Sequence, residues 1–152
     1  MSAQANIVAF DGAATPVSHT LVPMGAGIDL KLGSAIVKWS EKIASLPDEA
    51  QVRATMTKQK LKNGTTRVAL NVEVPIMETV TNQNAAGYTA APKVAFVDVI
   101  QVVGYHSPRS TVNSRRLVRQ LALNIAGSVA TSVVPVTTGP FPELVDQGIA
   151  AS

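Results

Sequence analysis

The sequence predicts an α+β protein in which an antiparallel sheet is followed by C-terminal helices. Apolar and polar residues alternate with a period of two in both halves of segment 51–75, which is typical of half-buried strands. Runs rich in valine and isoleucine precede position 106, whereas helical spacing of apolar residues begins after position 110. The 152 residues suffice for one core, so we expect a single domain over 1–152.

Within this domain we expect an N-terminal hairpin over 1–24, a sheet over 35–106, a helical region over 110–138 and a tail over 139–152. The hairpin has arms at 6–10 and 17–22, joined by a turn that contains Gly12 and Pro16. After the glycine-rich residues 25–27, the apolar residues of 35–39 suit a further strand. Residues 46–49 end that strand.

The clearest local signal is the hairpin within 51–75, whose turn is marked by Asn63-Gly64. A two-residue turn there would pair apolar with polar residues on one face, which a half-buried sheet does not tolerate. A three-residue loop ending in a left-handed Gly64 restores the match and sets Thr55 opposite Asn71. A five-residue loop keeps the same parity.

The second half of the chain predicts a strand and then a helix. Residues 81–87 read as a loop, and the β-branched run over 94–105 predicts a strand that is central or covered at an interface. Ser110 or Thr111 can cap the helix, which should end near Gly127. Its apolar stripe comprises Leu117, Val118, Leu121, Ala122 and Ile125.

Segment 129–142 stays open between a strand and a short second helix. Its valines favour a strand, whereas its position in the chain favours a helix. Pro140-Phe141-Pro142 excludes a long helix there.

Composition points to a surface that is partly hidden against other copies of the chain. Hydrophobic residues make up 46% of the sequence but charged residues only 15%, below the roughly 25% typical of soluble domains. There is no cysteine, and the sequence pattern predicts neither a secretory signal nor a membrane span. His19, in a predicted strand, and His106, in a predicted loop, lack partners in the sequence, so we expect no enzyme activity, no metal and no cofactor.

Basic charge is concentrated although the net charge is only +3. Between positions 51 and 72 there are five basic residues and no acidic one: Arg53, Lys58, Lys60, Lys62 and Arg67. Cations beside small hydrogen-bonding groups suit binding of single-stranded RNA. An ordinary solvated face is an equally good interpretation of the same charges. A second group, Arg109, Arg115, Arg116 and Arg119, suits subunit pairing, packaged RNA or an exposed helix face.

Segment 39–75 carries a family resemblance. Its Val-Lys-Trp opening, its Arg-x-Thr-x-Thr-x-Gln strand and its Thr-Arg-Val-Ala-Leu-Asn-Val-Glu-Val-Pro strand resemble the coat proteins of single-stranded RNA bacteriophages, the levivirus group. The resemblance implies a five-stranded antiparallel sheet plus an N-terminal hairpin, with C-terminal helices that pack on a dimer partner. It also implies assembly into an icosahedral shell around an RNA genome, within a virion formed in the bacterial cytoplasm.

The resemblance further implies that one sheet face binds a genomic RNA hairpin, which represses translation and marks the RNA for packaging. The implied RNA-binding residues are Arg53, Thr55, Thr57, Gln59, Arg67, Ala69, Asn71, Glu73 and Gln101. Two departures from the family pattern concern base recognition. Ala69 replaces a threonine that helps to hold an adenine, and Val99 stands near the position of a stacking tyrosine.

Two other functions compete with the coat-protein interpretation. The first is a cellular RNA-binding module that uses its sheet face. The second is a small hydrolase that uses His106. Large RNA-containing particles would distinguish the coat protein from both.

Overall fold

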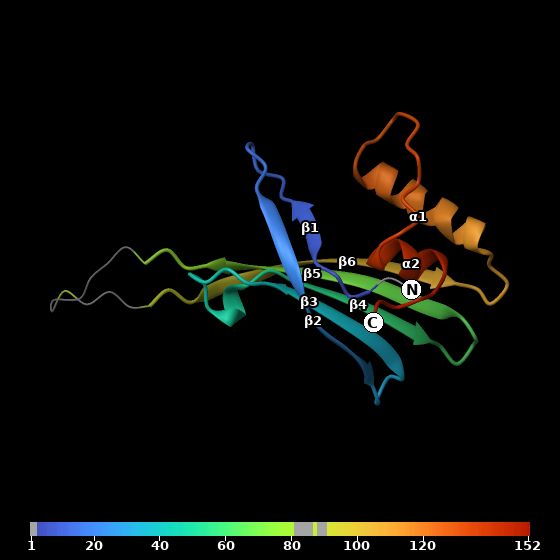
Figure 1. The fold of residues 1–152 in the computed structure, drawn as a ribbon, viewed down its shortest axis with the longest axis horizontal. Helices are drawn as coiled ribbons and strands as arrows, with labels where there is room; N and C mark the ends of the chain where they lie inside the picture. The colour runs from blue at the N-terminus through green and yellow to red at the C-terminus, as the bar shows by residue number, and fades with distance from the viewer. Residues whose placement is uncertain (1–2, 81–86, 88–90) are drawn as a thin grey trace.

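The computed structural model describes residues 3–80, 87 and 91–152. Six strands form one antiparallel sheet in chain order (Figure 1): β1 (Ile7–Phe10), β2 (Ser18–Asp29), β3 (Ser34–Glu41), β4 (Arg53–Lys60), β5 (Thr66–Met77) and β6 (Val94–His106). A short 3-10 helix, η1 (Asp48–Ala50), joins β3 to β4, and the helices α1 (Val112–Ala126) and α2 (Pro140–Asp146) follow β6. The α+β class is therefore confirmed.

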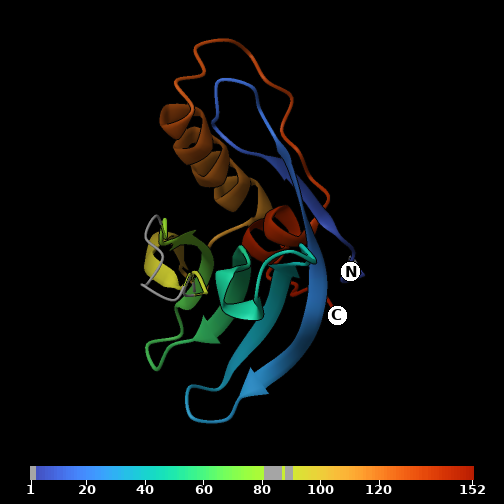
Figure 2. The same ribbon diagram turned by 90° about the vertical axis from the view of Figure 1, so that its left-hand side faces the viewer.

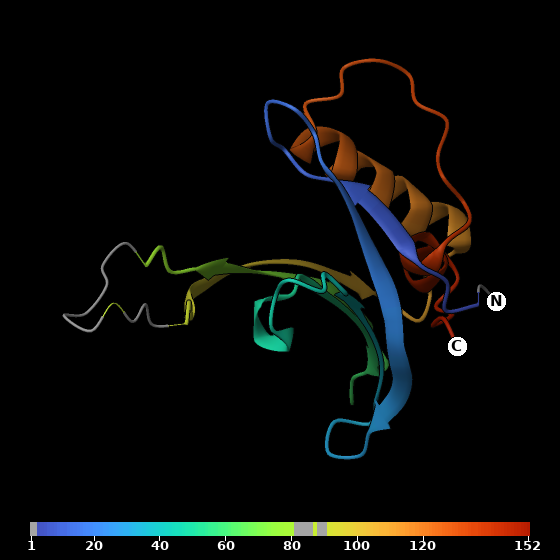
Figure 3. The same ribbon diagram turned by 60° about the vertical axis from the view of Figure 1, so that its left-hand side comes forward.

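The sheet is curved, and the two helices lie over the same face of it (Figure 3). Helix η1 lies on the other side, and the N-terminal hairpin rises on the side of α1 (Figures 2 and 3). The chain ends meet, since the Gln4 amide donates to the Ser152 carbonyl over 3.1 Å. The side of the sheet over which α1 and α2 lie is the helix face, and the opposite side is the polar face.

The sequence suggested an N-terminal hairpin separate from a five-stranded sheet. In the structure, the hairpin is continuous with the sheet. The sequence predicted that the second strand of the hairpin ends near residue 22, but β2 continues through the glycines to Asp29. Gly25 and Gly27 pair with Lys38 and Ile36 of β3. The neighbouring strand supplies hydrogen bonds that local glycine propensity does not predict.

The β4–β5 hairpin has the predicted register. Thr55 lies opposite Asn71, and the Leu61 amide donates to the Thr65 carbonyl over 2.8 Å, which closes a three-residue loop. Gly64 has the expected left-handed backbone, with φ of +82°. The loop predicted over 81–87 lies outside the described residues except for Gly87.

Strand β6 is an edge strand in the described chain, because it pairs only with β5. Of the two predicted alternatives, the central position is therefore wrong for a single chain, and cover at an interface stays a prediction. The apolar side chains of β6 are exposed in the single chain: Ile100 is 72% exposed and Phe96 is 56% exposed. Such an unpaired, apolar edge is a surface that proteins normally cover.

Helix α2 covers the centre of the helix face. Leu144 and Val145 pack with Val68 and Trp39 in the hydrophobic core. The segment expected to be a tail thus contains the second helix, whereas residues 129–138 form neither helix nor strand. Pro140 starts α2, because the first helical position needs no backbone N–H donor, and this helix is short, with seven residues.

Helix α1 begins and ends as predicted. Thr111 is the N-cap and forms a reciprocal capping box with Ser114, and Gly127 is the C-cap. The predicted apolar stripe is left uncovered by this chain: Leu117 is 61% exposed, Leu121 52% and Ile125 76%. A helix with a bare apolar stripe lacks the cover that its sequence requires.

Candidate nucleic-acid interface

The polar face consists of rows of side chains that cross strands β3 to β6, since directly paired residues project to the same side. One row runs from Lys38 through Thr55 and Asn71 to Gln101. The three other rows are Ile36, Thr57, Ala69 and Val103; Ser34, Gln59, Arg67 and Tyr105; and Ser40, Arg53, Glu73 and Val99. All nine residues predicted to contact RNA therefore lie on one face.

Four of these nine side chains already have partners within the chain. The guanidinium of Arg53 pairs with Glu73, with 3.2 Å between Nη2 and Oε2. The Asn71 amide donates to the same carboxylate over 2.9 Å. The Gln59 amide donates to the Leu32 carbonyl over 3.1 Å. Glu73 thus neutralises the charge of Arg53 across the ladder and holds Asn71 on its own strand.

Arg67 retains a free charge, because its guanidinium has no ion pair among the described residues. It lies opposite Tyr105, whose side chain is 63% exposed. A guanidinium beside an exposed aromatic ring has the chemistry that phosphate binding and base stacking require. Ala69 is only 2% exposed, so its methyl group forms part of the floor of this face.

Tyr105, Ile36 and Lys38 also belong to this face, although the sequence pattern was not taken to predict them. Tyr105 was detectable, because Val99, Gln101 and Val103 lead to it by strict alternation along β6. Ile36 and Lys38 were not, because their facing depends on how β3 pairs with β4. An aromatic group is therefore present on β6, at a different position from the one expected by resemblance.

Several other basic residues form contacts on the helix side of the sheet. Lys58 lies on the helix face and donates to the Gly148 carbonyl over 2.6 Å. The helical arginines are also engaged within the chain. Arg116 and Arg119 pair with Asp146, and Arg115 donates to Ser110. The carboxylate of α2 thus engages Arg116 and Arg119, whereas Arg109 is exposed.

Both histidines differ from their predicted settings. His19 is not without partners: it lies 3.1 Å from Glu41 and 3.5 Å from Asp11. Two backbone amides, of Val17 and Ala13, together with His19 hold the pKa of Asp11 below its usual value. His106 is the last residue of β6 instead of a loop residue, and it is buried with no hydrogen bond to Nε2.

The pH dependence of stability should report on His106. Burial lowers the pKa of this imidazole below 6.5, and the positive charge of Arg115 lowers it further, against a smaller opposite effect of Asp146. Protonation therefore favours the unfolded chain, so stability is retained above pH 6.5 and is lost as the pH falls through the folded value. Urea midpoints between about pH 7.5 and 5.5 should fall less in His106→Gln than in wild type. Equal falls would contradict this assignment.

An apolar groove lies on the helix face, beside α2 and the N-terminal hairpin. Its volume is about 510 Å³. Its lining includes Ile7, Leu21, Ala54, Met56, Leu70, Val72 and Phe141. The apolar stripe of α1 does not fill this groove in its own chain, because its side chains remain exposed. The molecule therefore presents an apolar groove and an apolar helix stripe at the same time.

The described residues contain no catalytic arrangement. They include no group of three or more histidine, aspartate or glutamate residues that could hold a metal ion. Within the same residues, no helix is long and apolar enough to cross a membrane. What this geometry offers is surface for association.

Comparison with known proteins agrees with the fold. The levivirus coat protein family matches residues 2–141. The virus-like particle of bacteriophage EMS014 superimposes with a TM-score of 0.74 and 26% identity, over 98% of this chain and 99% of that chain. The particle of bacteriophage ESE058 has a TM-score of 0.67 and 23% identity, over 97% and 98% of the two chains. The bacteriophage GA capsid protein shares the fold at 14% identity and a TM-score of 0.54, over 95% of each chain.

No curated protein matches the chain in sequence. The fold and the family match nevertheless define the class of protein: a structural capsid protein and not an enzyme. The chain belongs to the levivirus coat protein family. The resemblance noted in segment 39–75 therefore extends over nearly the whole sequence.

Proposed function

We propose that two copies of this coat protein join through β6 into one continuous sheet. The exposed apolar edge of β6 supports this pairing, because its unpaired backbone groups can continue the antiparallel ladder. In the same dimer, the α1 stripe of each subunit fills the apolar groove of its partner. The complementary exposure of Leu117, Leu121 and Ile125 and of the groove is the observation that carries this proposal.

The dimer is the building unit of an icosahedral shell in the proposed assembly. Support comes from the solved virus-like particles of bacteriophages EMS014 and ESE058, whose subunits share this fold. The shell encloses a single-stranded RNA genome and forms in the cytoplasm of a bacterial host. The small charged fraction of 15% fits a chain whose apolar surface is largely covered in the assembly.

The polar face is the proposed RNA-binding surface. Arg67 binds phosphate, Thr55 and Thr57 donate and accept hydrogen bonds, and Tyr105 stacks on a base. The same face recognises a hairpin of the genome, and this binding represses translation and selects the RNA for packaging. The guanidinium of Arg67 forms no ion pair with any residue that the structure describes and lies on a face rich in hydroxyl and amide groups, which supports this role.

Electron microscopy of the protein expressed alone tests the assembly. We expect closed particles that contain host RNA, and treatment with nuclease after disassembly should release protein of dimer mass. A stable monomer in light scattering, with no particles at any ionic strength, would contradict the coat function. The result is independent of which RNA is packaged.

The RNA role is tested separately by substitution on the polar face. Arg67→Ala should weaken binding of RNA fragments recovered from the particles by roughly tenfold, since such contacts contribute about 1–3 kcal/mol. Thr55→Ala should weaken it less, and both variants should still form particles. Lys58→Ala is the control, because this lysine lies on the helix face. Equal affinities of wild type and Arg67→Ala in filter binding would refute the assignment of this face.

A further inference from the structure

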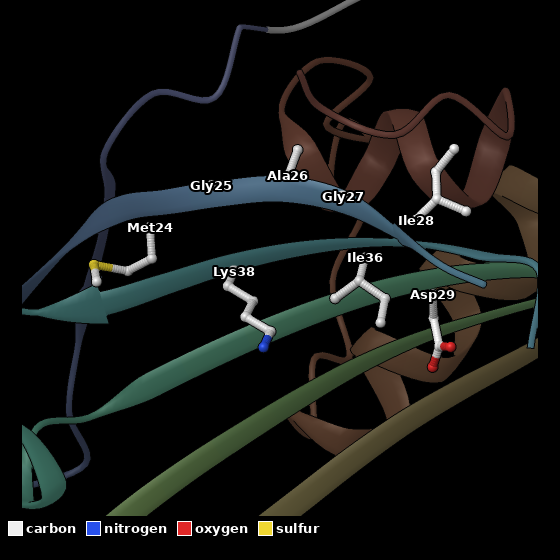
Figure 4. A pocket seen from close by; sticks show the side chains of 8 residues that line it. All are labelled: Met24, Gly25, Ala26, Gly27, Ile28, Asp29, Ile36 and Lys38. Carbon is white, nitrogen blue, oxygen red and sulfur yellow. The ribbon is translucent and has the colours of Figure 1, made fainter. Parts of the chain in front are cut away.

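A hollow of about 340 Å³ opens on the polar face between β2 and β3 (Figure 4). Its floor is the backbone of Gly25 and Gly27, and its walls are formed by Met24, Ile36 and Lys38. Figure 4 shows these three side chains on the side of the sheet away from the C-terminal helices. The volume lies within the roughly 300–1,000 Å³ of small-molecule sites.

An irregularity in β2 creates this hollow. The register with β3 shifts between Pro23 and Gly25, which leaves Met24 as an extra residue. Gly25 has φ of +122°, a backbone conformation that other residues rarely adopt. Bulges of this kind redirect a side chain, and here Met24 becomes a wall of the hollow.

The two glycines keep the floor free of side chains. A Cβ atom added at Gly25 or Gly27 would meet no heavy atom within 4 Å, so the space above each is open. The floor is held in place because the Gln4 side chain donates to the carbonyls of Gly25 and Lys38, over 3.1 and 2.9 Å. The hollow is therefore a preformed, flat-floored slot between two tied strands.

Charge distinguishes the two ends of the slot. Lys38 Nζ has no hydrogen-bond or ion-pair partner in the described part of the chain, whereas Lys42 pairs with Asp48. At the other end, one oxygen of Asp29 accepts hydrogen bonds from the amides of Lys31 and Leu32. An anion is therefore favoured at the Lys38 end and disfavoured at the Asp29 end.

The slot is continuous with the proposed RNA surface. Lys38 lies opposite Thr55, and Ile36 lies opposite Thr57. A neighbouring hollow of about 240 Å³ shares Met24 and Lys38 with the slot and extends to Arg53 and Thr55. A strand of RNA on β4 and β5 can thus reach β2 without leaving the polar face.

We propose that this slot binds one nucleotide of single-stranded RNA. The base lies on the glycine floor between Met24 and Ile36, and the phosphate pairs with Lys38. A flat apolar slot accepts any base through its π-face, and a flexible lysine reaches phosphate as a point charge. The inference rests on the proposed RNA-binding function and extends its path to β2 and β3.

Fluorescence anisotropy on the full-length protein freed of RNA tests the slot, with a fluorescein-labelled single-stranded RNA of mixed sequence as probe. Gly27→Val fills the floor and should weaken binding at least about fivefold, as expected for the loss of one stacked base. Lys38→Gln should weaken binding and lower the slope of log affinity against log salt by about 0.7. Lys31→Gln is the matched control, because it removes the same charge outside the slot and should bind as wild type does.

Photocrosslinking with 4-thiouridine RNA provides a second measurement that needs no variant. We expect crosslinked peptides that contain Met24 or Ile36. The slot proposal is overturned if the slot variants bind like Lys31→Gln and no such peptide appears. The RNA-binding function stands in that case if Arg67→Ala binds weakly. If wild type binds no RNA, both the slot proposal and the RNA-binding function are wrong. Should Gly27→Val fail to fold, Lys38→Gln and the crosslinks decide.

Discussion

Replacing Asp146 by asparagine should lower the free energy of unfolding by about 3–5 kcal/mol, the cost of removing one member of a buried ion pair. Asp146 is fully buried and binds Arg119 through both carboxylate oxygens, each at 2.9 Å, and Arg116 at 3.1 Å. Asparagine keeps the shape but leaves the buried guanidinium of Arg119 without a counter-charge. Urea denaturation at neutral pH measures the effect.

The state of Asp146 also sets a pH limit. Burial alone would raise the pKa of this carboxyl, but hydrogen bonds and charge from Arg119 and Arg116 outweigh burial and hold it below 3.8. Its contribution to stability is therefore present above that pH and is lost as the pH falls through the lower folded value. Asp146→Asn should remove this part of the acid sensitivity.

An exposed ion pair provides the control. Asp48 pairs with Lys42 at the surface, so Asp48→Asn should stay within about 1 kcal/mol of wild type. Because Arg119 also donates to the Val136 carbonyl, loss of Asp146 should loosen segment 129–138 as well as α1. Equal urea midpoints for Asp146→Asn and Asp48→Asn would show that this pair does not hold α1 in place.

Leu121→Glu should abolish particle formation while the single chain still folds. Leu121 is 52% exposed on α1, so a carboxylate there stays in water in the isolated chain. In the proposed dimer the same carboxylate would enter the apolar groove of the partner without a counter-charge. Burying an unpaired charge costs several kcal/mol per subunit, and each dimer would contain two.

Size-exclusion chromatography with light scattering, together with circular dichroism, measures this outcome. We expect monomer with the secondary structure of wild type. Gln120→Glu is the control, since it adds the same charge to the same helix beside the stripe and should leave particles intact. Particles of normal yield from Leu121→Glu would show that the α1 stripe is not an interface.

Local patterns were sufficient to predict much of the sheet and one helix. Period-two alternation placed Thr55 opposite Asn71, and parity alone selected the odd loop at Gly64, because a slip of one residue would reverse both faces. The cap at Thr111 and the end at Gly127 also follow from residues adjacent to the helix. Such features depend on neighbours within a few positions.

Features that depend on distant residues were not predictable. The continuation of β2 through Gly25 and Gly27 requires β3 as a partner, and the burial of Arg119 requires Asp146, which lies 27 residues further along the chain. The placement of α2 within the expected tail has the same cause, since its short apolar face is stabilised by Trp39 and Val68 and not by helix propensity.

By itself, the sequence determined the fold class, the register of the central hairpin, and the side of the sheet on which Thr55, Arg67 and Asn71 lie. Hydrophobic periodicity specifies these, because it decides which side chains leave water. Only the tertiary structure decided which cations stay free for a ligand. It neutralised Arg119 with Asp146, and within the described residues it left Arg67 and Lys38 without an ion pair on the polar face. Charge pairing depends on distance in space, and a linear pattern does not contain that distance.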